Sequence, residues 1–116
     1  PLSIAQNTYW TWASKYKFFM LEGRVDTLGA QNPDVIFSYH SGFDSLYREI
    51  TIPIDDLFIT SAGDSIILEF DLGTAINGDS GLVDFVDESF SHSESDFEIV
   101  ERISNNLVNA FSINQY

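Results

Sequence analysis

The chain has 116 residues, 44% of them hydrophobic and 15% aromatic, which is enough to build the buried core of one domain. Five basic residues against 18 acidic ones give a formal net charge of −13, which repels phosphate backbones and argues against a nucleic-acid partner. The absence of cysteine excludes disulfides, thiolate metal sites and thiol nucleophiles. No apolar run reaches the roughly 18 residues that a membrane span requires.

Two segments in the first half of the chain have the pattern of β-strands. Residues 16–21 are apolar on both alternating faces, which is typical of a central strand covered on both sides. The next segment places Val35, Phe37 and Tyr39 on one face. His40 falls on the opposite face, so we expect it to lie outside the main core.

The middle of the chain predicts shorter elements and one long loop. Residues 48–54 alternate as a half-buried edge strand, and residues 66–71 alternate as a half-exposed strand. Residues 58–59 are candidates for the hairpin partner of that second strand. The Gly, Asp and Ser content of residues 73–94 predicts a long surface loop in which only residues 82–86 are packed.

The last element is predicted as an amphipathic helix. Ser95 followed three residues later by Glu98 is a capping-box signature. Five apolar residues then recur at helical spacing: Phe97, Val100, Ile103, Leu107 and Phe111. We therefore expect residues 1–116 to form a single mostly-β domain, an antiparallel β-sandwich with one C-terminal amphipathic helix.

The chain contains two histidines, His40 and His92, and neither belongs to a close-spaced metal motif. Two imidazoles that meet across a fold can hold copper with a third nitrogen or oxygen donor. The alternative is that both are packed or solvated without a metal. Trp10 and Trp12 share one face if that segment is extended, and core packing is the alternative reading of this pair.

Other site types find little support in the sequence. Five acidic residues could offer oxygen ligands to calcium, but their spacing does not fit a calcium loop, and a solvated acidic surface explains them better: Asp71, Asp79, Asp84, Asp87 and Glu88. We find no glycine-rich phosphate loop and no nucleophile elbow. A hydrolase would need an assembled nucleophile and base, so we expect no enzymatic activity.

Three stretches resemble the MbnP-like family of periplasmic or surface copper-binding proteins, which are linked to methanobactin-type copper handling. The first runs from Tyr9-Trp10-Thr11-Trp12 to Leu21-Glu22-Gly23. The second is Phe37-Ser38-Tyr39-His40-Ser41-Gly42, and the third combines Ser91-His92-Ser93 with the run from Ile103 to Phe111. Together the stretches span nearly the whole chain.

The resemblance implies a copper site that includes a modified tryptophan. In that family a partner dihaem enzyme oxidises a tryptophan of an M-x-W-x-W motif to kynurenine, whose amine helps histidines to bind copper. Trp10 and Trp12 fall on the two tryptophan positions of the motif. The resemblance therefore implies copper at His40 and His92, with a kynurenine derived from Trp10 or Trp12.

The chain also departs from the family pattern. Thr8 stands where methionine is usual, and Lys15 replaces a small residue beside the tryptophans. Family members carry further strands before this motif, so we expect the C-terminal part of a larger sandwich, completed by a missing N-terminal segment or another chain. The expected function is copper binding in the periplasm, at the cell surface or in secreted form. The alternative is an extracytoplasmic structural or interaction module with a vestigial metal site.

Overall fold

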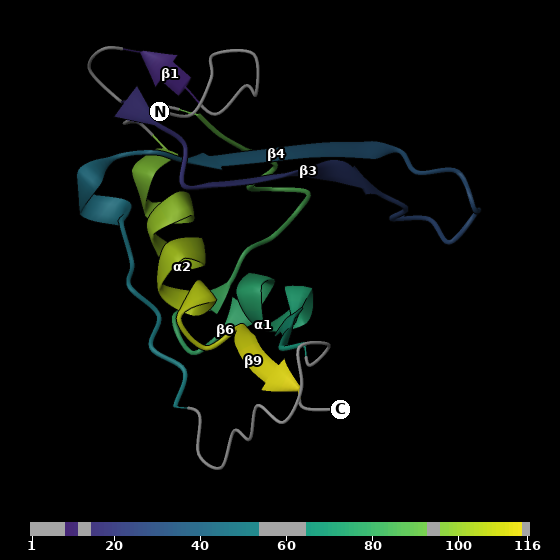
Figure 1. Cartoon of the computed structure of the whole chain (residues 1–116). Coiled ribbons are helices and arrows are strands. Elements are labelled where there is room, and N and C mark those ends of the chain that lie inside the picture. The colour runs from purple at the N-terminus through teal and green to yellow at the C-terminus, as the bar shows by residue number, and fades with distance from the viewer. Residues whose placement is uncertain (1–8, 12–14, 54–64, 93–95, 115–116) are drawn as a thin grey trace.

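The structure is a computed structural model that describes residues 9–11, 15–53, 65–92 and 96–114 (Figure 1). The strands are β1 (Tyr9–Thr11), β2 (Lys15–Tyr16), β3 (Phe19–Val25), β4 (Val35–Ser41), β5 (Ile67–Phe70), β6 (Asn77–Gly78), β7 (Gly81–Leu82), β8 (Phe90–Ser91) and β9 (Phe111–Asn114). The helices are the 3-10 turn η2 (Asp44–Leu46), α1 (Leu72–Ile76) and α2 (Phe97–Leu107). None of the helices in these ranges is long and apolar enough to cross a membrane.

The described residues form a mixed α/β domain in which the strands make several small sheets. Strands β3, β4 and β8 make a three-stranded sheet, and the pairs β1–β2, β5–β9 and β6–β7 make two-stranded ones. The long pair β3–β4 is antiparallel, whereas β8 joins β4 in parallel. No closed β-sandwich is present within the described ranges, so the expected sandwich is not borne out there.

The β3–β4 hairpin confirms the strand predicted over residues 35–40. It shows that the bounds of the strand predicted over residues 16–21 are wrong. The pairing runs from Val25 opposite Val35 to Phe19 opposite Ser41. The earlier strand therefore occupies Phe19–Val25 and not residues 16–21, because residues 15–16 belong to the separate strand β2. The two longest strands among the described residues thus lie side by side in a fixed register.

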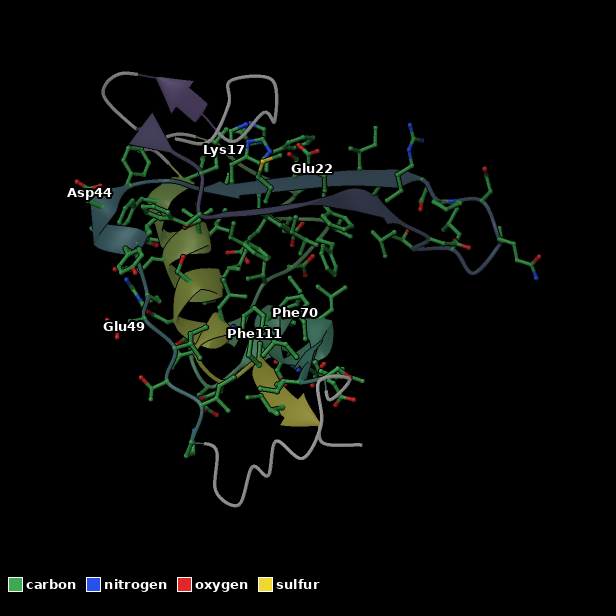
Figure 2. The ribbon with its side chains drawn as sticks, viewed as in Figure 1. Lys17, Glu22, Asp44, Glu49, Phe70 and Phe111 are labelled. Atoms are coloured by element: carbon green, nitrogen blue, oxygen red, sulfur yellow. The ribbon has the colours of Figure 1, made fainter. Side chains whose placement is uncertain are left out.

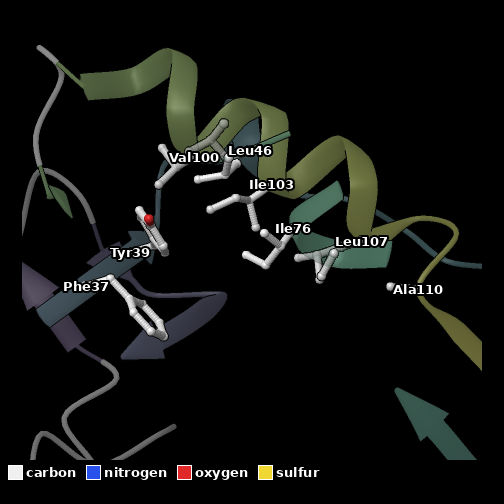
Figure 3. Close-up of a cluster of buried hydrophobic side chains, with 10 residues drawn as sticks. Phe37, Tyr39, Leu46, Ile76, Val100, Ile103, Leu107 and Ala110 are labelled. Atoms are coloured by element: carbon white, nitrogen blue, oxygen red, sulfur yellow. The ribbon is translucent and has the colours of Figure 1, made fainter. Parts of the chain in front are cut away.

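The inner face of this hairpin packs on α2 to form the core. Phe37 and Tyr39 point inward as predicted, and Tyr39 is completely buried beside Val100 and Ile103 of the helix (Figure 3). Gly23 lies directly opposite Phe37 in the sheet. A Cβ at residue 23 would stand 2.7 Å from the Phe37 ring, so glycine leaves room for that ring.

Helix α2 confirms the predicted C-terminal amphipathic helix. Val100, Ile103 and Leu107 are buried along one stripe. The buried hydroxyl of Ser104 makes a 3.0 Å hydrogen bond with that of Ser41, which links the helix to β4. The helix begins at Phe97, and Ser95 of the predicted capping box lies outside the described residues.

The predicted continuation of the helix to Phe111 is wrong. The helix ends at Leu107, and Phe111 starts β9, which pairs antiparallel with β5. The Phe70 and Phe111 rings lie directly across this pair, with centroids 5.0 Å apart. β5 thus pairs with a segment from the C-terminal end of the chain, and residues 58–59, the expected hairpin partner, lie outside the described residues.

The prediction of a long loop over residues 73–94 is also wrong. This stretch holds most of α1, the β6–β7 hairpin and β8, and it buries Ala75, Ile76 and Val83. The buried side chain of Asn106 on α2 supports it, because its Nδ2 donates to the carbonyls of Ala75 and Gly81. A polar side chain of α2 thus satisfies backbone carbonyls of this stretch, which is folded and is not an open loop.

The edge strand predicted over residues 48–54 is wrong as well. Residues 48–53 are not in a strand. The Arg48 guanidinium instead donates to the Asn105 side chain on α2 and to the carbonyls of Ser45 and Tyr47. The segment is therefore held against the helix by a side chain and not by a ladder of backbone hydrogen bonds.

Candidate metal centre

The two histidines lie next to each other on the outer face of the three-stranded sheet. Their ring centroids are 4.1 Å apart, and the ring planes are inclined by 33°. The parallel register of β4 and β8, in which Tyr39 lies opposite Ser91, explains this placement. His40 follows Tyr39 within β4, and His92 directly follows Ser91 at the end of β8, so this ladder brings the two histidines side by side.

A carboxylate from β3 and a hydroxyl from β4 complete the cluster. Glu22 on β3 lies opposite Ser38 on β4, and alternation places both on the same face as His40. The Nε2 atom of His40 is 2.7 Å from Oε1 of Glu22. Figure 2 shows Glu22 and Lys17 on the face of the hairpin that points away from Phe70 and Phe111.

The Ser38 hydroxyl is the common partner of the other three groups. Its Oγ lies 3.1 Å from Glu22 Oε1, 2.8 Å from His92 Nε2 and 3.4 Å from His40 Nε2. Two imidazole nitrogens and one carboxylate oxygen therefore approach a single point. This convergence is the central geometric feature of the cluster.

The hydrogens of the network can be assigned from the chemistry of its members. An ionised carboxylate can only accept, so Nε2 of His40 and Oγ of Ser38 both donate to Glu22. The single hydroxyl hydrogen of Ser38 is then used, so Nε2 of His92 donates to Ser38. Without a metal, both imidazoles carry a hydrogen on Nε2, and the hydrogen bonds lead to Glu22.

Burial differs sharply among these side chains. His40 is only 7% exposed although it lies outside the main core, whereas His92 is exposed and the Glu22 side chain is 53% exposed. One wall of the cluster is therefore fixed by packing, and the other is open to solvent. An ion could enter from the side of His92 and Glu22.

The environment of His40 disfavours its protonated form. Burial lowers the pKa of His40, the hydrogen bond to Glu22 acts against this, and the nearby His92 and Lys17 lower it further. The pKa of the Glu22 carboxyl is also lowered, first by the hydrogen bond from His40 and then by that from Ser38. A neutral imidazole beside an ionised carboxylate is the protonation state that a metal ion requires.

The donor set fits copper by its chemistry. Imidazole nitrogens suit copper and zinc, and a carboxylate oxygen is an acceptable additional ligand for the divalent ions. No group of three or more His, Asp or Glu side chains within the described residues is already arranged to hold a metal ion. The Ser38 hydroxyl lies between the donors, so binding would require the side chains to rearrange around it.

The two tryptophans can be placed only in part. The backbone of Trp10 belongs to β1, and Trp12 lies outside the described residues. β1 pairs with β2, which leads directly into Lys17, a residue close enough to affect the pKa of both Glu22 and His40. Figure 1 shows strand β1 on the side of β3–β4 away from α1, and Figure 2 shows Glu22, a member of the cluster, on that same side.

Sequence reasoning missed Glu22 and Ser38 as members of this cluster. Alternation along β4 already placed Ser38 on the face of His40, but Glu22 becomes visible only once the register between β3 and β4 is known. The acidic residues weighed for calcium include local caps: Asp71 accepts from Gly73 N and Thr74 Oγ1, and Asp84 accepts from Val86 N. These carboxylates stabilise turns and helix starts.

Comparison with known proteins identifies one family. The sequence model of the MbnP family matches residues 1–94, which include β1 to β8 and both histidines. This match confirms the resemblance read from the sequence. No curated protein and no solved structure matches the chain.

Proposed function

This chain belongs to the MbnP family, and we propose that it is a non-enzymatic, extracytoplasmic copper-binding protein whose metal ligands are His40 and His92. Family membership connects the chain with methanobactin-associated copper handling. The same family association supports periplasmic, cell-surface or secreted placement. The proposal for this chain adds the two residues that hold the ion.

The adjacency of His40 and His92 is the observation that supports this proposal. The two residues come from distant parts of the sequence, and the centroids of their imidazole rings lie 4.1 Å apart, with His92 exposed to solvent. Two rings this close repel each other when both are protonated, whereas a shared cation turns the same proximity into attraction. Both rings approach one hydroxyl, and this convergence supports a shared metal ion.

The family association also suggests a third nitrogen donor from a modified tryptophan. We propose that a partner dihaem enzyme converts Trp10 or Trp12 to kynurenine: dioxygen, or two molecules of peroxide, opens the indole C2–C3 bond to give N-formylkynurenine, and water then releases the C2 carbon as formate. The conversion exchanges one carbon atom for one oxygen and leaves an aromatic amine, whereas indole offers only an N–H donor. Peptide mass mapping of protein from its native source tests this exchange at each tryptophan.

Copper titration of three proteins tests the histidine site: the wild type, His40→Ala and His92→Ala. Each substitution removes one of the two histidine ligands. We therefore expect the affinity for copper to fall by more than about 100-fold, which is more than the loss typical when a residue that only supports a ligand is changed. Glu101→Gln is a control, because Glu101 is exposed on α2. Unchanged affinity in both histidine variants would reject the site.

A structural or interaction module with a vestigial metal site is the second candidate. Strand β5 favours it, because Ile67, Leu68 and Phe70 are 42%, 57% and 41% exposed. Apolar residues on a sheet edge favour pairing with another segment or chain. This function predicts that wild type and both histidine variants bind copper equally weakly.

A further inference from the structure

We propose that a hollow beside α2 binds a small aromatic carboxylate, with the ring among apolar side chains and the carboxylate at Arg48 and a buried serine hydroxyl. None of the side chains that line this hollow belongs to the histidine cluster. The inference therefore goes beyond the proposed copper function and does not depend on it.

The hollow lies where the start of β3, the end of β4, η2 with the segment after it, and α2 come together. Its volume is about 150 Å³, and its walls are mostly apolar: Phe18, Phe19, Leu46, Ile50, Leu107 and Phe111. An engineered protein cavity of about 150 Å³ with walls of Leu, Ile and Phe stays dry and holds one benzene ring. The size and lining of the hollow therefore favour a ligand with a single ring.

Two buried hydroxyls form a polar part of the lining. Ser41 and Ser104 are 2% and 1% exposed, and their Oγ atoms lie 3.0 Å apart. Two hydroxyls carry two hydrogens, and the hydrogen bond between them uses only one. The second hydrogen has no acceptor among the described residues, and a buried donor without an acceptor is costly. A ligand oxygen in the hollow would accept this hydrogen.

Arg48 supplies a positive charge at the same hollow. It is half-buried, and its guanidinium donates only to neutral oxygens, those of the Asn105 side chain and of the Ser45 and Tyr47 carbonyls. No carboxylate forms an ion pair with it in the part of the chain that the structure describes, although the sequence has 18 acidic residues. Asn105 directly follows Ser104 on α2, so the guanidinium is held close to the hydroxyl pair. The charge of Arg48 is therefore available to an anion.

These groups favour a carboxylate over a neutral ligand of the same shape. The described residues that line the hollow include no acidic side chain, so an anion meets no like charge there. A carboxylate only accepts hydrogen bonds, and its bonds to a guanidinium and a hydroxyl are strengthened by its charge. An amide of the same shape carries no charge and presents its own donor hydrogens where the lining already offers donors.

Titrations of the wild-type protein at pH 7 with benzoate, benzamide and acetate test the proposal, followed by the methyl NMR signals of Leu46, Ile50 and Leu107. Benzamide has the shape of benzoate without its charge, and acetate has the charge without the ring. We expect benzoate to bind at least about 10-fold more tightly than either, and to shift these methyl signals. Benzoate binding no tighter than that of benzamide, or binding that leaves these signals unmoved, would overturn the proposal.

Arg48→Gln, Arg48→Lys and Arg24→Gln test the role of the guanidinium. We expect Arg48→Gln to weaken benzoate binding by about 10-fold and to keep the weaker benzamide binding within about twofold, which shows that the hollow is intact. Arg48→Lys keeps the charge without the planar fork and should retain part of the benzoate affinity. Arg24→Gln makes the same charge change on an exposed residue of β3 and should affect neither ligand. Equal losses of benzoate binding in Arg24→Gln and Arg48→Gln would overturn the assignment of Arg48.

Ile50→Trp tests the ring site without removing Arg48, which also contacts α2. Ile50 lines the hollow, is half-buried and is not in a strand, so a larger side chain there is expected to occupy the space of the ligand ring. Binding of both benzoate and benzamide should fall by at least about 10-fold. Wild-type affinity for benzoate in Ile50→Trp would place the ring elsewhere and overturn the proposal.

Discussion

His92 lies against His40 because two residue pairs of a short parallel ladder, Ser38 with Phe90 and Tyr39 with Ser91, bring the two chain segments together. The position of the exposed His92 ring beside the buried His40 ring thus depends on the two-residue strand β8. Ser91 strengthens this strand, because it is fully buried and its hydroxyl donates to the carbonyl of Asp96 just before α2. The histidine pair is therefore tied to the helix that forms the core.

Ser38→Ala tests whether the central hydroxyl is a ligand or only a hydrogen-bonding partner. A neutral hydroxyl is a poor copper ligand beside imidazole and carboxylate, so we expect the dissociation constant for copper to stay within about threefold of wild type. Competition titration against a copper chelator measures this. A loss as large as that of His40→Ala would make Ser38 itself a ligand.

Tyr39→Phe should leave the protein equally stable or stabilise it by about 1 kcal/mol, as judged by urea unfolding. Tyr39 is fully buried, and its hydroxyl has no hydrogen-bond partner among the described residues. Burial and the nearby charges of Glu88 and Asp84 raise the pKa of Tyr39 to about 12, so the group stays neutral. A clear loss of stability would reveal a partner for the hydroxyl.

Glu88→Gln should destabilise the protein by about 1 to 2 kcal/mol at neutral pH. Glu88 accepts from the backbone N–H of Asp84 and from Arg102, which also donates to the carbonyl of Leu82. These contacts, led by the Asp84 N–H, lower the pKa of the Glu88 carboxyl from its ordinary 4.5.

The effect of Glu88→Gln should depend on pH in a definite direction. Since the folded pKa is the lower one, the contribution of the carboxylate is fully present above 4.5 and is lost as pH falls through the folded value. The difference in unfolding free energy between wild type and variant should therefore be smaller at pH 3 than at pH 7. A difference of equal size at both values would contradict the assignment.

Gly78→Ala should destabilise the protein by about 1 to 3 kcal/mol. A Cβ there would lie 2.6 Å from the carbonyl oxygen of Thr74 and 2.7 Å from Oδ1 of Asn106. Both atoms are held in place, since Asn106 Oδ1 also accepts from the backbone N–H of Ser80. Thermal unfolding measures the change, and a variant as stable as wild type would show that the β6–β7 turn can move away from the helix.

The sequence predicted the elements whose apolar pattern is regular and local. The alternation in residues 35–40 predicted which side chains face the core, and the spacing of Val100, Ile103 and Leu107 predicted α2. Residues 73–94 were missed because their turn residues resemble a loop, although Asn106 supplies the hydrogen bonds that hold them. Pairing of β5 with β9 depends on contacts between distant segments, which local patterns do not encode.

Only the part of the candidate site that depends on residue type could be predicted from the sequence. The two histidines could be named because histidine is rare in this chain and suits copper. Glu22 could not be separated from the many other acidic residues, because its role follows from facing Ser38 across the sheet. A charged residue on a strand can be assigned to a site only when the strand register shows which residues it faces.

Crystals grown with one equivalent of copper test the central claim most directly, through anomalous diffraction measured at the copper absorption edge. The account predicts one strong peak per chain between the Nε2 atoms of His40 and His92, within bonding distance of both and next to Glu22. A peak elsewhere on the molecule, or bonded to neither imidazole, would contradict it.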